Sequence, residues 1–532
     1  MRNFADFKIN GFYLKHPSIV AFIVFIGGLL RIFQLASKSI WYDEARSISF
    51  AQKQWVMILY DHYLMRPVYF LGLKLWTTYF GYQELAVRSL SVIFGIVSIY
   101  ILYKIGKLLF DKKVATLAAF LLSLSTYHVV RCQQARGYAL SMLLVLLSLY
   151  FFWKILKNFN TKNYVFFAIG MLTIFYTNFL AAIIMSIIYN VFYLAYKAKM
   201  KKWLISQVLI ILFASLLIIP AIKYYHIEVE HDKNCPAENR NILSSIIEDF
   251  SYGKYLSQGG NGRYRDPHRP WASKGLFYLF ISIVIYVSFK IYFMLIRSKK
   301  KRYKISAEVI FITIWFIVTL VGFFIINRFI PIGRWSKTAI IVLPAFYLSI
   351  SLCIRQLSRV FRALSIILIV LFSVVSLFSF YYPSDNKSWR EIAELIKSNI
   401  KEGDVLIFAP SLQLVPFRYY YEYNMQRQLA AIKYGDSDSG ILTKNNRQTD
   451  FYNECNLVVG IKFNELENFI KKKSVFKYKK NNFWLIISPG WFTRSDTDLL
   501  LKHMGSYCSL KYKQSYPWEG VDIYYYAIKD GQ

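Results

Sequence analysis

The stretch Phe361–Tyr381, FRALSIILIVLFSVVSLFSFY, decides the fold class of this 532-residue chain. Arg362 is its only charged residue, and its length matches the roughly 20 residues that an α-helix needs to cross the hydrocarbon of a bilayer. It lacks the charged face that a surface helix of a soluble protein carries. We therefore interpret it as a membrane-spanning helix.

Ten further apolar runs of similar length precede it in a chain that is 56% hydrophobic. They cover residues 17–36, 84–104, 114–131, 137–156, 163–177, 180–196, 203–222, 272–296, 305–328 and 336–354. Residues 66–80 are also apolar but are too short to span a bilayer, so we expect an interfacial or re-entrant helix there. The predicted fold is an α-helical polytopic membrane protein with about eleven spans plus this interfacial helix.

The formal net charge is +34, which in a soluble protein would favour nucleic acid as a partner. Here the basic residues gather in alternate short connections between the apolar runs. These connections are Lys104–Lys113, Lys154–Lys162, Lys197–Lys202, Arg297–Lys304 and Arg355–Arg362. Positive residues mark the cytoplasmic side of a membrane protein. We therefore predict a multi-pass protein of the cell membrane with a cytoplasmic N-terminus and no nucleic-acid partner.

This orientation predicts that residues 382–532 form a soluble extracytoplasmic α/β domain, following a transmembrane domain at residues 1–381. The tail pattern indicates a helix at Trp389–Ile400 and several strands. The strands are expected at Asp404–Phe408, Leu457–Ile461, Phe483–Ile487 and Val521–Ala527. Neither a GxGxxG nor a P-loop motif is present in the tail, so no nucleotide site is expected in it.

An acidic pair follows the first apolar run, in the stretch Trp41-Tyr42-Asp43-Glu44-Ala45-Arg46. Two adjacent carboxylates are costly to hold in the low dielectric of a membrane surface, so such a pair usually has a function. On a helix Asp43 and Glu44 point about 100° apart, so one can face a cleft while the other braces the structure. The alternative is an ordinary helix N-terminus, where acidic residues favour the helix dipole.

The same stretch resembles the signature of the protein O-mannosyltransferase and aminoarabinose transferase group of C-type membrane glycosyltransferases. Six further motifs resemble that group in the same order along nearly the whole chain. They are Met65–Tyr69 (MRPVY), Glu84–Ser91 (ELAVRSLS), Gln133–Leu140 (QQARGYAL), Tyr176–Phe179 (YTNF), Arg334-Trp335 with Pro344, and Trp389–Glu391 with Gly403–Val405. The resemblance implies that residues 1–381 are a transmembrane glycosyltransferase domain, which transfers a monosaccharide from a polyprenyl-phosphate carrier to an extracytoplasmic glycan, lipid or protein.

The resemblance implies that Asp43 acts on the acceptor hydroxyl, as a general base or by orienting it toward the anomeric carbon. Such a displacement inverts the configuration at the anomeric carbon. It needs only one carboxylate, because the leaving group is already a phosphate. Glu44 is the second candidate catalytic residue and would support Asp43 from behind.

The leaving phosphate needs cations, and arginine suits paired oxygen contacts. By motif match Arg46 and Arg66 are the first candidates for phosphate binding. Weaker candidates on the same face are Arg136, Arg334 and Lys337.

Sugar or acceptor contacts are expected from four further residues: Tyr42, Tyr69, Gln134 and Asn178. The two tyrosines would stack on sugar faces. Gln134 and Asn178 are departures from the group, which usually has Glu and often has His at these places. Arg66 likewise replaces a His or Lys, so substrate contacts are expected to differ while the reaction class is retained.

A loop expected at residues 223–271 contains a dense set of possible metal ligands: His226, Glu228, Glu230, His231, Asp232 and His268. They lack a fixed helical spacing such as HExxH, so we expect no metal and no other cofactor. The loop is instead expected to shape or cover the acceptor side.

Two other function classes share the many-spanned architecture. A transporter or flippase for lipid-linked saccharides is disfavoured, because few ionisable residues lie near the centres of spans and no internal repeat is visible. A polysaccharide polymerase or ligase is separated from the transferase by the early Asp-Glu loop and the folded tail.

Overall fold

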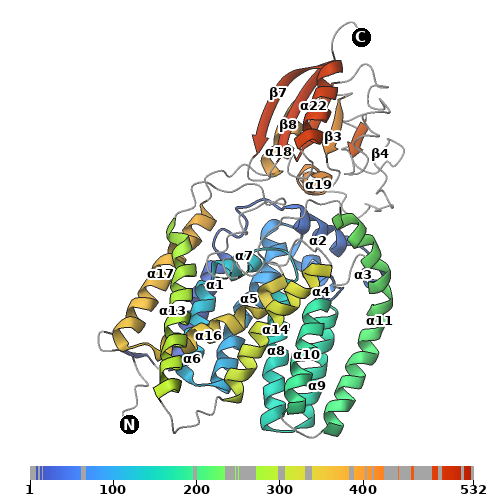
Figure 1. Cartoon of the computed structure of the whole chain (residues 1–532). Helices are drawn as coiled ribbons and strands as arrows, with labels where there is room; N and C mark the ends of the chain where they lie inside the picture. Colours follow the sequence, from blue (N-terminus) through green and yellow to red (C-terminus); the bar gives the residue numbers. More distant parts are fainter. Residues whose placement is uncertain are drawn as a thin grey trace.

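The computed structural model describes most of the helical body and part of the tail (Figure 1). The described residues are 7–9, 12–14, 16–60, 67–195, 200–233, 246, 250, 271–297, 306–329, 338–382, 389–401, 404–409, 413–423, 441–442, 457–460, 482–488, 494–516 and 521–528. Among them a short N-terminal hairpin, β1 (Phe7–Ile9) and β2 (Phe12–Leu14), precedes the first helix.

Each apolar run predicted as a span coincides with a helix or a bent pair of helices. These are α1 (His16–Ile32), α5 (Glu84–Leu109), α6 (Lys112–Leu124) with α7 (Thr126–Cys132), α8 (Tyr138–Lys157), α9 (Thr161–Phe175), α10 (Phe179–Ala195), α11 (Met200–Lys233), α13 (Trp271–Arg297), α14 (Ala307–Phe329), η1 (Ala339–Val342) with α16 (Leu343–Gln356), and α17 (Arg359–Tyr381).

Five helices among the described residues are long and apolar enough to cross a membrane, or six if the bent pair α6–α7 is one span. α1, α9, α10 and a part of α13 are apolar but shorter. The count of eleven spans therefore stays a prediction, whereas the mostly helical architecture with apolar spans is confirmed.

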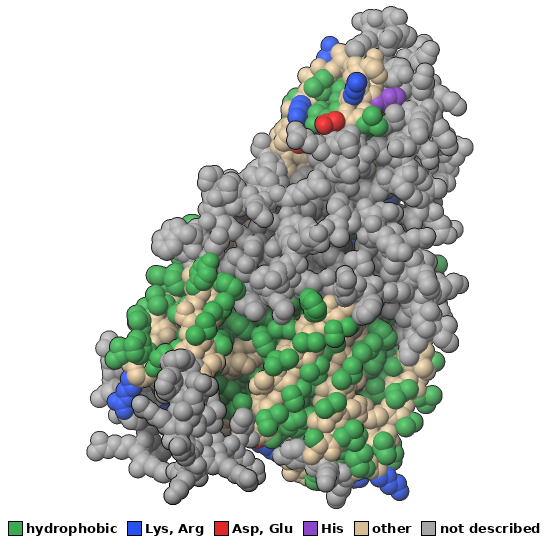
Figure 2. All heavy atoms as spheres, in the orientation of Figure 1, with side chains coloured by type: hydrophobic (Ala, Val, Ile, Leu, Met, Phe, Trp, Pro, Cys, Tyr) green, Lys and Arg blue, Asp and Glu red, His purple; other side chains and the backbone are tan. Residues whose placement is uncertain are grey.

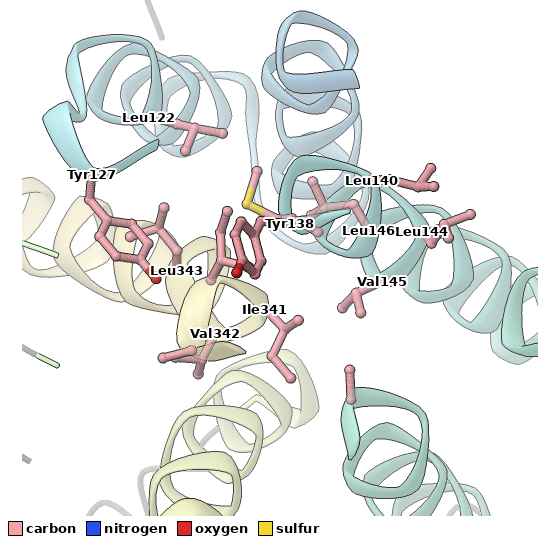
Figure 3. Close-up of a cluster of buried hydrophobic side chains, with 14 of the residues drawn as sticks. Leu122, Tyr127, Tyr138, Leu140, Leu144, Val145, Leu146, Ile341, Val342 and Leu343 are labelled. Carbon is pink, nitrogen blue, oxygen red and sulfur yellow. The ribbon is translucent and has the colours of Figure 1, made fainter. Parts of the chain in front are cut away.

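Apolar side chains gather over the described helices on the face of the helical body that Figure 2 shows. For example, Phe25, Val165, Leu212 and Ile367, on four different helices, are between 51% and 63% exposed. Surface of this kind is unstable in water and stable against lipid tails. Inside the body, α8 packs against α7 and against η1 through Tyr127, Tyr138 and their aliphatic neighbours (Figure 3).

The predicted span 114–131 is broken at Ser125, where α6 and α7 meet at 62°. The last carbonyls of α6 lose their helical partners at such a break and need others. Arg31, which is fully buried on α1, donates to the carbonyls of Leu122 and Ser123 at 3.0 and 3.1 Å. The break lets the chain turn at residues 133–137 beside the acidic pair.

The segment between α1 and α5 forms three short helices: α2 (Tyr42–Gln52), α3 (Trp55–Tyr60) and α4 (Pro67–Phe80). α4 coincides with the expected short helix at 66–80. Its buried face, which includes Phe70 and Leu73, packs on α2 and α5. The expected loop 223–271 is wrong at its beginning, because α11 continues to Lys233 and carries His226 to Asp232 on a helix.

The tail contains a sheet of six strands in the order β4-β5-β3-β6-β8-β7. The strands are β3 (Val405–Ala409), β4 (Ile441–Leu442), β5 (Leu457–Gly460), β6 (Phe483–Ile487), β7 (Cys508–Tyr516) and β8 (Val521–Ile528). β5, β3 and β6 run parallel, and the other pairings are antiparallel. Helices α18 (Trp389–Asn399), α19 (Leu414–Tyr423) and α22 (Arg494–Tyr507) accompany the sheet.

The expected helix and four expected strands of the tail coincide with α18, β3, β5, β6 and β8. Strand β7 was not expected. It is an edge strand whose middle residues, including Lys511 and Lys513, are exposed. Exposed lysines are usual on edge strands, where they oppose further strand pairing, but they hide the strand from a hydrophobicity pattern.

Candidate active site

The acidic pair occupies the first turn of α2, and both side chains are buried: Asp43 is 4% exposed and Glu44 is 1% exposed. A buried carboxylate is stable only when cations or N–H donors compensate for the water that it loses. The two side chains point in different directions and meet different partners. The surroundings therefore distinguish the two carboxylates: Glu44 holds neighbouring elements together, whereas Asp43 lies beside a further arginine.

Glu44 forms a two-pronged ion pair with Arg88 of α5. Arg88 donates through Nε to Oε1 at 2.8 Å and through Nη2 to Oε2 at 2.7 Å. The backbone N–H of Ala135 donates to the same Oε1 at 2.8 Å. Glu44 thus ties the start of α2 to α5 and to the turn between α7 and α8.

Arg88 also closes the loop in front of α2. Its Nη atoms donate to the carbonyls of Leu35, Lys38 and Ser39 at 2.7 to 2.9 Å. Sequence reasoning did not select Arg88 as a site residue. The motif Glu84–Ser91 contained it, but only its long-range contacts show what it holds.

Asp43 lies beside Arg136, which belongs to the turn after α7. Arg136 Nη1 donates to the backbone carbonyl of Asp43 and to Ser47 Oγ, each at 3.2 Å. Burial by itself would lower the pKa of Arg136, but the nearby Asp43 carboxylate and the Tyr138 hydroxyl outweigh it and raise that pKa. Arg136 is therefore a permanent cation next to Asp43.

A second arginine, Arg131, lies near the same Tyr138 ring as Arg136. Its guanidinium lies 5.4 Å from the centre of the Tyr138 ring, and that of Arg136 lies 5.9 Å away. Arg131 is 3% exposed and donates to Gln134 Oε1 at 3.2 Å. The buried Nε atoms of both arginines have no hydrogen-bond partner within the described part of the chain. Two guanidiniums, each with an unpaired Nε–H group, suit an anionic ligand.

Sequence reasoning selected Arg136 and Gln134 but missed Arg131. An arginine inside the apolar stretch 126–132 was the available signal, because a charge at that depth is costly without a purpose. The separation of five residues between Arg131 and Arg136 does not by itself predict that both side chains lie near the Tyr138 ring. The turn at residues 133–137 brings them together.

The remaining sequence candidates lie at different places. Tyr69 is 1% exposed; its hydroxyl is 3.0 Å from Ser91 Oγ, and burial raises its pKa. Asn178 is 8% exposed and accepts from the N–H of Ala181 at the start of α10. Tyr42 and Arg46 are partly buried on α2, with Arg46 5.5 Å from the centre of the Phe50 ring.

Three predicted cations lie outside the described residues: Arg66, Arg334 and Lys337. The side chains of His226 to Asp232, and His268, are also outside what the structure describes. Among the side chains that it does describe, no group of three His, Cys, Asp or Glu residues is placed to hold a metal ion.

Residues 65–224 match the family model of dolichyl-phosphate-mannose-protein mannosyltransferases. This segment contains four of the seven motifs that carry the resemblance, together with Arg88, Arg131 and Arg136. The resemblance to the O-mannosyltransferase and aminoarabinose transferase group is confirmed. The matched segment thus carries the three arginines of the site, whereas Asp43 and Glu44 precede it. Comparison with curated proteins gave no match.

Solved structures show that the whole chain shares the fold of this glycosyltransferase group. ArnT from Cupriavidus metallidurans in the apo state has a TM-score of 0.53 and 11% sequence identity, over 95% of this chain and 97% of that chain. The same protein bound to undecaprenyl phosphate has a TM-score of 0.51 and 12% identity over the same shares.

The archaeal oligosaccharyltransferase AglB from Archaeoglobus fulgidus, in complex with an inhibitory peptide and a dolichol-phosphate, gives a TM-score of 0.51 and 13% identity. The match covers 97% of this chain and 74% of that chain. The similarity therefore includes the tail of this protein as well as its apolar helices.

Proposed function

We propose that this protein transfers a monosaccharide, a hexose or a pentose, from a polyprenyl-phosphate carrier to a hydroxyl group of an extracytoplasmic glycan, lipid or protein. The observation that carries the proposal is the placement of buried Asp43 beside Arg136, with Arg131 near the same Tyr138 ring as Arg136. A carboxylate and two cations at one place match the two needs of the reaction, an acceptor proton and a leaving phosphate.

In this proposal Asp43 orients the acceptor hydroxyl and takes its proton as the oxygen attacks the anomeric carbon. The new carbon–oxygen bond forms on the face opposite the departing group, so the configuration inverts. The bond between the anomeric carbon and the phosphate oxygen breaks, and its electron pair leaves with the lipid phosphate. Arg136 and Arg131 stabilise the negative charge that develops there.

Glu44 is best assigned to holding the site together. Arg88 and the Ala135 N–H take up both of its oxygens, so it keeps α2 and the arginine-bearing turn in register. Its loss would displace Asp43 and Arg136 from each other. Arg46, Arg66 and Arg334 complete the proposed set of phosphate ligands by motif match, and Tyr42, Tyr69, Gln134 and Asn178 the proposed sugar and acceptor contacts.

We also propose that the reaction needs no metal. Guanidinium groups can supply the charge that a divalent cation supplies in other phosphate chemistry, because each offers paired donors to phosphate oxygens. The site is proposed to face the outside of the cell membrane, with the N-terminus in the cytoplasm. Residues 382–532 would then form an extracytoplasmic domain.

Mass spectrometry of envelope glycans and lipids from a strain that lacks the gene tests this function. We expect one hexose-, pentose- or aminosugar-sized substituent to be missing and the lipid-phosphate sugar to accumulate. Complementation with Asp43→Asn should leave the substituent missing, because loss of a general base costs about 10²- to 10⁴-fold in rate.

A matched variant separates the transferase from a transporter. Glu391→Gln also removes one carboxylate from the chain, on α18 of the tail, and should restore the substituent. Equal complementation by Asp43→Asn and Glu391→Gln at equal protein levels would contradict the proposed function. An unchanged envelope profile in the strain without the gene would also contradict it.

A further inference from the structure

Helices α18 and α19 of the tail lie between its sheet and the helical body (Figure 1). α19 packs directly against α2, the helix that begins with Asp43. The tail is therefore in contact with the element that carries the proposed catalytic carboxylate.

Tyr420 of α19 makes the closest link. The backbone N–H of Ile40 donates to its hydroxyl oxygen at 2.5 Å, and the hydroxyl donates to Glu84 Oε1 at 2.7 Å. Burial and the Glu84 carboxylate raise the pKa of Tyr420, so the hydroxyl keeps its proton and donates. One side chain thus joins the segment before α2 to the first residue of α5.

Arg390 of α18 reinforces the same point. Its Nη2 pairs with Glu84 Oε1 at 2.5 Å, and its guanidinium lies 5.8 Å from the centre of the Tyr420 ring. The Glu84 oxygen therefore receives one donor from each tail helix. Because a charged acceptor makes stronger hydrogen bonds than a neutral one, these contacts resist displacement of the tail.

The segment 35–40 is held from its other side by Arg88, which donates to the carbonyls of Leu35, Lys38 and Ser39. Tyr420 takes the N–H at the end of that segment, at Ile40. The polypeptide that leads into Asp43 is thus bracketed by the helical body and by the tail. Only two residues, Trp41 and Tyr42, separate the bracket from Asp43.

We propose that Tyr420 is a positioning residue, through which the tail sets the place of Asp43 for catalysis. The proposal rests on the proposed function of Asp43 and goes beyond it, because it gives the C-terminal tail a role in the transfer step. Without the Tyr420 hydroxyl the Ile40 N–H loses its partner, and the start of α2 gains freedom. A displacement of about 1 Å at a reacting group is enough to lower a rate substantially.

The test compares two neighbouring tyrosines of α19 in the full-length protein. The Tyr419 hydroxyl donates to the carbonyl of Tyr82 at 2.8 Å, so Tyr419→Phe also removes one hydrogen bond between the tail and the body. This hydrogen bond reaches Tyr82, which precedes α5, whereas that of Tyr420 reaches Ile40, which precedes α2. Each variant is expressed in the strain without the gene, and substituent formation is followed by mass spectrometry at equal membrane protein levels.

We expect Tyr420→Phe to slow substituent formation about tenfold and Tyr419→Phe to change it less than twofold. Binding of undecaprenyl phosphate to the purified protein should stay within twofold in both variants, since the proposed phosphate ligands are not in the bracket. A tail that only stabilises the protein would give equal effects for both variants, and this outcome would overturn the proposal.

Glu84 provides a second readout through a conservative variant. Glu84→Gln retains an oxygen that accepts from Tyr420, so it should keep more of the transfer rate than Glu84→Leu. Adding Tyr420→Phe to Glu84→Leu should cost less than Tyr420→Phe costs in the parent protein, because Glu84 holds the hydroxyl to which the Ile40 N–H donates. Additive losses would overturn the proposal.

The outcomes also separate this inference from the proposed function. Full activity of Tyr420→Phe with an inactive Asp43→Asn variant overturns the positioning role alone. Full activity of Asp43→Asn removes the proposed function and the positioning role with it.

Discussion

Arg88 and Arg136 are both buried or partly buried next to the acidic pair, but the protein uses their nitrogens differently. Each of the three guanidinium nitrogens of Arg88 donates to Glu44 or to a backbone carbonyl. Arg136 donates through Nη1, and its Nε has no partner among the described residues. The comparison teaches that a saturated cation builds the site and an unsaturated one leaves donors for a ligand.

Arg88→Leu should have the largest effect, because it leaves the Glu44 carboxylate buried without its cation. Breaking one side of a buried ion pair costs about 3–5 kcal/mol. Little folded protein should then reach the membrane, as measured by fluorescence-detected size exclusion of a tagged protein. The double variant Arg88→Leu with Glu44→Leu should recover part of the folded fraction; no recovery would mean that the pair does not act as a unit.

Arg136→Gln should keep the fold and lose the reaction. The side chain remains polar and can still donate to Ser47, but it loses the charge that is proposed to stabilise the leaving phosphate. We expect a loss of about 10²-fold in rate, comparable to removal of one stabilising donor at an oxyanion. Arg136→Lys should recover only part of it, because lysine lacks the paired donors. A large drop in melting temperature without the loss in rate would show that Arg136, like Arg88, mainly stabilises the structure.

Arg131→Gln sharpens the comparison at the second arginine near the Tyr138 ring. We expect about tenfold weaker binding of undecaprenyl phosphate to the purified protein, since a hydrogen bond to a charged group is worth about 1.5–3 kcal/mol. The change should not lower the stability of the folded protein, because Arg131 has no carboxylate partner within the described residues. Lys157→Gln, a matched loss of charge at the far end of α8, is the control.

Tyr69→Phe should have the smallest effect. It removes the hydroxyl that meets Ser91 Oγ, a neutral hydrogen bond worth about 1 kcal/mol, and keeps the buried ring. We expect a small drop in melting temperature and a rate within a fewfold of the parent. A loss as large as that of Arg136→Gln would show that the hydroxyl reaches the substrate.

Local patterns predicted most of the helices well. Each apolar run coincides with a helix, and α4 lies where a short interfacial helix was expected. A continuous apolar run reports its own burial in lipid or protein, so it needs no knowledge of distant residues. The break at Ser125 and the extension of α11 were missed, because both occur inside apolar or mixed stretches whose composition changes little.

The site was predicted less completely. The acidic pair and Arg136 were visible as motifs, whereas Arg88, Arg131 and Tyr420 were not selected. Their roles depend on contacts between residues that are distant in sequence, such as Ile40 with Tyr420 and Glu44 with Arg88. Nothing in the local pattern distinguishes these side chains from other arginines and tyrosines of a chain with 65 basic residues and 42 tyrosines.

The sequence by itself determined that this chain forms apolar helices around an early Asp-Glu motif, because hydrophobic length and residue type are local properties. Only the tertiary structure decided that Glu44 is saturated by Arg88, that Asp43 lies beside Arg136, and that the tail holds the approach to both. The physical reason is that a buried charge is stable only when specific partners compensate for the water that it loses. Only the folded chain shows which partners are within reach.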